Sequence, residues 1–245
     1  MITWLGHAGF KIRCKDPSSG EQKVIFIDPW LSCPTCPESE KTQEKADLIL
    51  VTHGHFDHCS DSPELSSKTG APIVAVRELA EVLSAKGAAQ ITGMNKGGTL
   101  EYDYCNVTMV SADHSGGGPD GVYAGAPTGF VVSFKDGSPS IYHGGDTNVF
   151  SDMKIISDLY QPQIALLPIG GHFTMSPREA AYALNQFLLS VKTVVPMHYG
   201  TFPLLKGNPE QLATELQNTF PNTSRGPLKI ENLNIGTEVE LSSIV

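Results

Sequence analysis

Three of the eight histidines in this chain of 245 residues fall within one short stretch, VTHGHFDHCSD at 51–61. The stretch follows the apolar run ADLILV at 46–51, which is typical of a strand buried on both faces. The motif H-x-H-x-D-H therefore lies on a loop that leads from a buried strand to a helix. This arrangement predicts an α/β architecture with the histidines at the edge of a sheet.

The spacing of these side chains suits metal binding. In a strand-to-helix loop, His53 and His55 can point the same way, while Asp57 and His58 point to a neighbouring spot. Imidazole nitrogens and carboxylate oxygens suit zinc, manganese, iron or nickel. Two metal ions close together need about three protein ligands each and a bridging group, so the motif supplies only part of the set.

Matching candidates follow three other strand-like runs. His114 stands in ADHSGG, Asp146 in HGGDT and His198 in VVPMHYGT. Gly144 and Gly145 let the backbone approach closely before the aspartate. Functional residues of α/β folds gather where strands end, and packing alone does not explain polar residues at all of these positions.

Short strand-like runs dominate the first half of the chain, and strands alternate with helices in the second half. A helix predicted at 176–189 begins with Ser176 as N-cap, Pro177 in the first turn and Glu179, which completes a capping box. No linker, repeat or low-complexity block is present, so we expect one domain over 1–245; the alternative is two domains divided near Pro139. The other predicted helices span 77–86 and 209–220, and the predicted strands span 2–5, 10–14, 24–28, 46–51, 71–76, 107–112, 129–134, 140–143, 164–168, 193–196 and 238–241.

The charge of the chain limits its partners. With 17 Lys and Arg against 26 Asp and Glu, the formal net charge is −9, which argues against binding nucleic acid. No apolar stretch approaches the roughly 20 residues that span a bilayer, and the first residues lack the features of a signal peptide. Five cysteines without a regular framework predict reduced thiols and a cytoplasmic location. We expect a small-molecule substrate; the sequence leaves a monomer and a homo-oligomer both open.

Several sequence blocks, in this order along almost the whole chain, resemble the metallo-β-lactamase superfamily. The likeness is closer to the metal-dependent hydrolases near L-ascorbate-6-phosphate lactonase and the N-acyl-phosphatidylethanolamine phospholipase D relatives. The resemblance implies an α/β fold, a four-layer αββα sandwich with two mixed sheets between helices. The blocks are WLGHAGF (4–10), IDPW (27–30), THGHFDH (52–58), YHGGDT (142–147), LPIGGHFTM (167–175) and MHYGTFPLL (197–205).

The resemblance also implies how seven side chains share two divalent metal ions. A first ion takes three histidines, a second takes two histidines and an aspartate, and a further aspartate bridges both together with a water. Zinc is the first choice, and manganese, nickel and iron are the alternatives. The ligands of the first ion are His53, His55 and His114, those of the second are His58, His198 and Asp57, and the bridging aspartate is Asp146.

Such a centre predicts hydrolysis. Two divalent cations, set against two carboxylates and a bridging hydroxide, keep a formal charge of about +1 and lower the pKa of bound water towards about 7. The hydroxide is then the nucleophile, and the expected substrate is a small, anionic ester, lactone or phosphodiester. Asp57 is a candidate to steer or accept a proton, although a ligating carboxylate makes a poor free base.

Three further histidines have two interpretations each. His7, in the turn of WLGHAG, either touches the substrate or a ligand, or is a buried structural residue. His172, in a glycine-hinged loop, either binds the leaving group or donates a proton, or it has no part in the site. We expect His143, before the two glycines of HGGDT, to be structural.

Residues beside the ligands can support the site. Asp28, at a strand end, either holds a ligating histidine or forms an Asp-Pro turn. Thr52 can brace the histidine loop. Tyr199 and Thr201 stand next to a predicted ligand, and Tyr123 lies in a glycine-rich loop of the kind that borders sites; each of them either contacts substrate or packs outside the site.

Cysteine chemistry is not expected. Cys33 and Cys36 form a single C-x-x-C without a second pair at zinc spacing. Cys59 adjoins a predicted ligand, and we interpret it as a small buried residue.

Other activities of the same fold remain as alternatives. A mononuclear iron dioxygenase of the persulfide type uses similar ligands, whereas a flavodiiron reductase has H-x-E-x-D where this chain has His55. A metal-dependent nuclease is disfavoured by the negative net charge. A scaffold with a decayed centre is disfavoured because every expected ligand is present. The sequence does not identify the substrate, the native metal or the general acid.

Overall fold

The computed structural model of the chain describes residues 1–118, 120–218 and 226–245. Its strands form two seven-stranded sheets. In the first sheet the spatial order is β14 (Glu238–Val239), β1 (Ile2–Gly6), β2 (Gly9–Lys15), β3 (Gln22–Ile27), β4 (Leu48–Leu50), β5 (Pro72–Val76) and β6 (Gln90–Met94). In the second it is β13 (Lys229–Ile230), β12 (Thr193–Met197), β11 (Ile164–Pro168), β10 (Ile141–His143), β9 (Thr128–Phe134), β8 (Cys105–Ser111) and β7 (Thr99–Glu101).

Both sheets are mixed in the same way. The pairs from β14 to β3 are antiparallel and those from β3 to β6 are parallel. In the second sheet, β7 to β10 pair antiparallel and β10 to β13 pair parallel. Parallel strands need crossover segments, and helices supply most of them.

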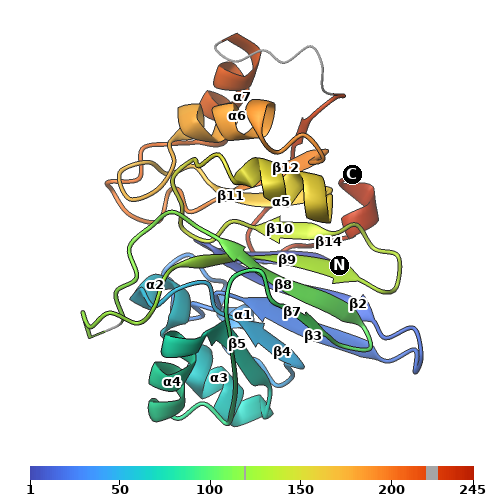
Figure 1. Cartoon of the computed structure of the whole chain (residues 1–245), viewed down its shortest axis with the longest axis vertical. Helices are drawn as coiled ribbons and strands as arrows, with labels where there is room; N and C mark the ends of the chain where they lie inside the picture. The colour runs from blue at the N-terminus through green and yellow to red at the C-terminus, as the bar shows by residue number, and fades with distance from the viewer. Residues whose placement is uncertain (119, 219–225) are drawn as a thin grey trace.

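Helices cover the outer face of each sheet, so that the molecule has four layers (Figure 1). One group lies against the first sheet and follows its parallel strands. The other lies against the second sheet, at the top of Figure 1. The first group is α1 (Glu38–Lys41), α2 (Phe56–Cys59), α3 (Ser62–Thr69) and α4 (Arg77–Ala85), and the second is α5 (Met153–Tyr160), α6 (Pro177–Gln186) and α7 (Pro209–Asn218), with a 3-10 turn at Leu241–Ser243.

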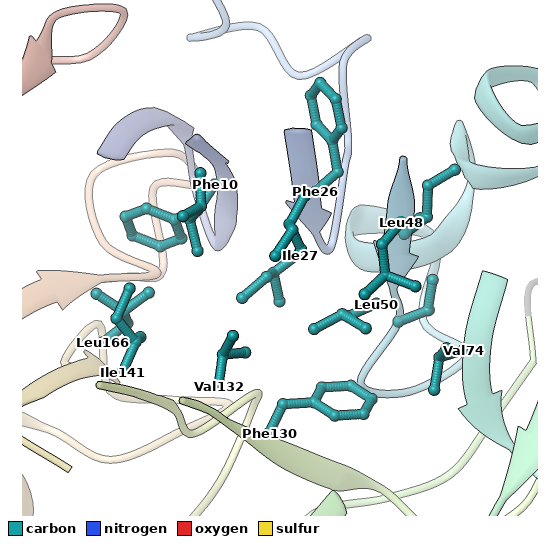
Figure 2. Packing of buried hydrophobic residues seen from close by; sticks show 14 of the residues in the cluster. Phe10, Phe26, Ile27, Leu48, Leu50, Val74, Phe130, Val132, Ile141 and Leu166 are labelled. Carbon is teal, nitrogen blue, oxygen red and sulfur yellow. The ribbon is translucent and has the colours of Figure 1, made fainter. Parts of the chain in front are cut away.

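The main hydrophobic core lies between the two sheets. Ile27 and Leu50 of the first sheet point towards Phe130 and Val132 of the second, and all of these side chains are fully buried (Figure 2). Strands from both halves of the chain contribute to this core. A second cluster fills the space between the second sheet and its helices. Each sheet is therefore covered on both faces, as its parallel part requires.

The predicted fold class is confirmed, and so are the predicted strands and helices within about two residues at most ends. α6 carries the predicted capping box at Ser176 and Glu179. It ends at Gln186, earlier than the predicted 189, because Phe187 leaves helical geometry and Leu189 is exposed. The predicted end of the helix at 209–220 lies outside the described residues. No helix within the described part of the chain is long and apolar enough to cross a bilayer.

Candidate metal centre

Four chain segments with His and Asp side chains end at one edge of the sandwich. β4 of the first sheet leads into 52–58 and the short helix α2, at the left of Figure 1. β8, β10 and β12 of the second sheet lead to His114, Asp146 and His198. The grouping therefore depends on the packing of the two sheets, since neither sheet carries the whole set.

Three imidazole rings converge on one point. The Nε2 atom of His53 lies 3.0 Å from Nδ1 of His55, and Nε2 of His114 lies 3.3 Å from the same Nδ1 atom. Nitrogen ligands of a tetrahedral zinc ion are themselves about 3.3 Å apart. Both distances to Nδ1 of His55 are thus those of ligands that share one cation, and ligand atoms of all three histidines lie within 4.8 Å of one another.

A second group lies beside the first. Asp57 and His58 lie in α2, and His198 follows β12; their ligand atoms, with one from His7, lie within 4.8 Å of one another. Nε2 of His198 is 3.9 Å from Oδ2 of Asp57. This is the grouping that the resemblance implies for a second ion, with His7 added.

Asp146 lies between the two groups. Its Oδ2 atom is 3.0 Å from Nε2 of His198 and 3.6 Å from Nε2 of His114. The same Oδ2 is 4.0 Å from Nε2 of His53, and Oδ1 is 3.3 Å from Nε2 of His58. One carboxylate therefore faces imidazoles of both groups, which is the geometry of a bridging ligand.

Buried atoms without partners test whether a metal fits these residues. Nε2 of His58, Oδ1 of Asp146 and both ring nitrogens of His198 are buried and make no hydrogen bond of good geometry, although His58 and His198 lie 3.3 and 3.0 Å from Asp146. A buried polar atom left unsatisfied costs about 1–3 kcal/mol. Divalent cations between these atoms would satisfy them, because imidazole nitrogen and carboxylate oxygen are suitable ligands. The residues therefore fit a metal centre.

Asp28 orients the histidines from behind. Its Oδ1 accepts the backbone N–H of Thr52 at 2.8 Å, and its Oδ2 accepts the Thr52 hydroxyl at 2.7 Å and Nδ1–H of His58 at 2.8 Å. Because the hydroxyl proton of Thr52 points to Asp28, the 3.0 Å contact between Thr52 Oγ1 and His53 Nδ1 has the histidine as donor. Both histidines thus keep Nε2 unprotonated and directed to the centre. Two predictions match this geometry. Asp28 contacts His58, a predicted metal ligand, and Thr52 contacts His53 in the histidine loop.

Charges in the cluster shift its titration. Burial would lower the pKa of His58, but the Asp146 and Asp28 carboxylates outweigh it and raise this pKa well above its ordinary value. Burial would raise the pKa of Asp146, but His198 and His58 hold it well below its ordinary value. The Asp28 and Asp146 carboxylates thus favour positive charge at this place, which a bound cation would supply as well.

Backbone strain concentrates at this edge. Among the described residues, five non-glycine residues have positive φ, and three of them are His7 (53°), Asp28 (46°) and His198 (55°). The left-handed region costs such residues about 1–3 kcal/mol when the surroundings impose it. A hydrogen bond from His198 N to the carbonyl oxygen of His7, 2.9 Å long, ties two of the three together. These strained backbone conformations therefore lower the stability of the fold but orient the side chains of the site.

His7 lies behind the centre. Its ring is buried; Nε2 is 3.0 Å from Oδ2 of Asp57, and Nδ1 is 3.0 Å from the hydroxyl of Thr201. Burial lowers the pKa of His7 to about 4, so the neutral ring donates Nε2–H to the carboxylate and accepts from Thr201. Its Nε2 is therefore occupied by a proton, and the structure gives His7 a positioning contact where the sequence left substrate contact open.

A cavity of about 650 Å³ opens onto the centre. Its polar lining comes from the two metal groups and Ser115, and its other walls are apolar. The sequence did not indicate these apolar residues, because isolated aromatic residues in loops have no distinctive pattern. They are Phe56, Phe173, Phe202, Pro203 and Leu204.

Three predicted substrate contacts lie away from this cavity. His172 is exposed and lines a neighbouring cavity of about 510 Å³, while the next residue, Phe173, lines the metal cavity. Tyr123 is 69% exposed and does not line the cavity. The hydroxyl of Tyr199 donates to Asn232 at 2.8 Å, and its ring packs on Trp4. The structure does not bring these residues to the centre.

Two residues near the ligands are structural. His143 donates from Nε2 to the carbonyl of Ala8 at 2.9 Å and accepts Gly145 N–H on Nδ1 at 3.1 Å, so both nitrogens are used. The Cys59 thiol is buried and donates to the carbonyl of Gly54 at 3.3 Å. Both observations agree with the structural interpretations of the sequence.

Gly54 allows the two loops of the centre to meet. A Cβ atom at this position would lie 2.6 Å from the carbonyl oxygen of Gly117 and 3.0 Å from the Cα atom of Gly118. No side chain fits there without displacing the loop that follows His114. The glycine of H-G-H therefore has a packing role between its two histidines.

Comparisons with known proteins agree with this architecture. A family model described as a beta-lactamase superfamily domain matches residues 23–199. A UPF0173 metal-dependent hydrolase of Koribacter versatilis is 48% identical over 215 residues, covering 86% of this chain and 89% of the relative. Another from Myxococcus xanthus is 47% identical over 221 residues, covering 88% of this chain and 76% of the relative.

Solved structures give the same result. A metallo hydrolase from the archaeon Ignicoccus hospitalis has a TM-score of 0.81 and 33% identity, with 97% of this chain and 96% of that chain covered. An isothiocyanate hydrolase from Delia radicum gut bacteria has a TM-score of 0.71 and 17% identity, with 98% of this chain and 99% of that chain covered. The second similarity shows the fold alone.

Proposed function

The chain belongs to the UPF0173 metal-dependent hydrolases of the metallo-β-lactamase superfamily, and from this premise we propose that a dinuclear centre hydrolyses a small ester, lactone or phosphodiester. Two ions would be held by His53, His55 and His114 in one group and by Asp57, His58 and His198 in the other, with Asp146 facing both groups. The observation that carries the proposal is the convergence of these atoms, several of them buried without partners, beside an open cavity. The lactone is included because of the sequence likeness to the ascorbate-phosphate lactonase branch.

Two divalent cations, when bound, supply Lewis acidity and an acidic water, and their charge favours an anionic reacting group. Zinc is the expected metal, with manganese, nickel or iron as alternatives. The chain's own contribution is to fix the ligands. Asp28 holds His58 and, through Thr52, His53 in the tautomer that leaves Nε2 free.

Asp57 is a ligand in this proposal and not a general base. Burial opposes its ionisation, but the hydrogen bond from His7 and the charge of His58 outweigh burial and lower its pKa below the ordinary value. A carboxylate with a depressed pKa accepts protons weakly at neutral pH. His7 then acts by orienting Asp57, and its own contact with Thr201 orients His7.

The test is metal-resolved activity. The chain is stripped with a chelator, reloaded with zinc, manganese, nickel or iron in turn, and assayed with bis(p-nitrophenyl) phosphate, p-nitrophenyl esters and simple lactones. We expect hydrolysis to return with about two ions per chain. Asp146→Asn should lose most of the activity and one ion, and the exposed Asp158→Asn on α5 should lose neither. A fully loaded chain that hydrolyses none of these substrates would contradict the proposal.

The main competing function is a mononuclear iron dioxygenase. With only one ion per chain, the second metal-ligand group would have no role. Asp57, His58 and His198 would then surround no ion, although His198 has two unpartnered buried nitrogens. Iron content of about one ion per chain and oxygen uptake with glutathione persulfide would favour the dioxygenase. A nuclease is opposed by the net charge of −9.

A further inference from the structure

The walls of the metal cavity are more apolar than an anionic substrate requires. Phe56, Phe173 and Leu204 line it with 53%, 51% and 51% of their surfaces exposed. Large apolar side chains left open to water at a catalytic cavity indicate the surface that a ligand covers. Phe202 and Pro203 complete this wall.

The apolar wall is held by its own packing. The ring of Trp30 lies edge-on to Phe56, with centroids 5.6 Å apart, and stacks on Phe202 at 5.9 Å. Phe202 also meets the ring of His7 edge-on at 5.3 Å. Through His7, this aromatic cluster is joined to Asp57 in the metal centre. Phe56 and Phe202 are therefore held in a fixed position relative to the metal centre.

The charged groups of the cavity are those of the metal centre. Within the described part of the chain, no Lys or Arg lines it. Lys206 and Arg178 line the neighbouring cavity together with His172, and Leu204 lines both cavities. A phosphate group remote from the scissile bond would therefore have no Lys or Arg partner in the metal cavity.

We propose that the substrate is a carboxylic ester or lactone with an apolar aryl or alkyl group next to the scissile bond, and that Phe56, Phe173 and Leu204 bind this group. This inference rests on the proposed function. In the reaction, the oxygen of one water adds to the carbonyl carbon and the C–O bond to the alcohol breaks. The alcohol oxygen takes one proton of the water, so that an acid and an alcohol are released, or a hydroxy acid from a lactone.

The test uses p-nitrophenyl acetate, butyrate and hexanoate with the zinc-loaded chain. Each buried methylene should raise kcat/KM roughly fourfold until the cavity is filled. Phe173→Ala and Leu204→Ala should flatten this dependence on acyl length. Leu159→Ala, which truncates a 67% exposed leucine on α5, should leave it unchanged.

A binding measurement complements the kinetics. The uncharged fluorophore N-phenyl-1-naphthylamine should bind the metal-free chain, and Phe173→Ala combined with Leu204→Ala should abolish its fluorescence increase. Esters hydrolysed without any dependence on acyl length would overturn the inference while leaving the proposed function intact. Preference for a phosphorylated substrate that is lost in Lys206→Ala would also overturn it. Failure to hydrolyse any ester, lactone or phosphodiester would instead defeat the proposed function.

Discussion

Replacing Asp28 by asparagine separates the support of the centre from its ligands. Asparagine has the same shape and is one of the residues that tolerate positive φ, so the backbone at 46° is not further strained. It offers one acceptor oxygen where the carboxylate offers two. The NH₂ group of the asparagine must then face either the N–H donor of Thr52 or the two donors Thr52 Oγ1 and His58 Nδ1.

The expected cost follows from these contacts. The less harmful orientation loses the hydrogen bond from Thr52 N and weakens the one from His58, since hydrogen bonds to a charged group contribute about 1.5–3 kcal/mol. Loss of a group that orients a metal ligand typically lowers metal affinity roughly 10–100-fold. That factor corresponds to about 1.4–2.7 kcal/mol of metal-binding free energy. This is similar in size to the energy of the weakened hydrogen bonds.

The assay is zinc competition against a chromogenic chelator, with urea unfolding of the metal-free chain as a second measurement. Asp16→Asn is the matched control, because Asp16 also accepts backbone and hydroxyl hydrogen bonds, from Ser18, but lies in a distant turn. We expect only the Asp28 variant to lose zinc affinity. A folded Asp28→Asn chain that binds zinc within twofold of wild type would refute the argument that Asp28 positions the ligands.

Three further predictions concern the packing of the chain. Gly54→Ala should keep the circular dichroism spectrum of the folded chain but bind one metal ion fewer per chain by elemental analysis, because its Cβ would lie 2.6 Å from a carbonyl oxygen of the facing loop. The control Gly226→Ala, with open space around the added Cβ, should bind both metal ions. Equal metal content in the two variants would contradict this explanation. Leu50→Ala should lower the free energy of unfolding by about 2–5 kcal/mol in urea titrations, because the side chain is fully buried between the sheets; a loss well below that range would count against the core. Burial raises the pKa of the Cys14 and Cys36 thiols to about 12. At pH about 8, a thiol reagent should therefore label the native chain slowly and all five cysteines of the denatured chain quickly. Rapid labelling of the native chain would contradict the burial of these thiols.

The sequence predicted the framework because strands and ligands leave local patterns. The apolar run before Thr52, the capping box at Ser176 and the spacing of His53, His55 and His58 each depend on neighbours a few residues apart. Some elements escaped prediction because they are short: α2 has four residues and β13 has two, too few for any periodicity. The eight-residue helices α3 and α5 and the strand β6 were not predicted either.

Contacts made across the fold could not be predicted in the same way. The hydrogen bond between His7 and Asp57 joins residues 50 positions apart, and His7 reaches Thr201 across 194 positions. The aromatic wall from Phe56 to Phe202 depends on the packing of one sheet against the other. Sequence spacing therefore identified candidate ligands, while the groups that orient them and line the cavity became visible only in three dimensions.

The most direct test of the centre is a crystal structure of the zinc-loaded chain with anomalous data at the zinc edge. We expect two strong peaks, one among His53, His55 and His114 and one among Asp57, His58 and His198. The carboxylate of Asp146 should contact both. A single peak, or none at this edge of the sandwich in zinc-saturated crystals, would contradict the claim that these strand ends form a dinuclear centre.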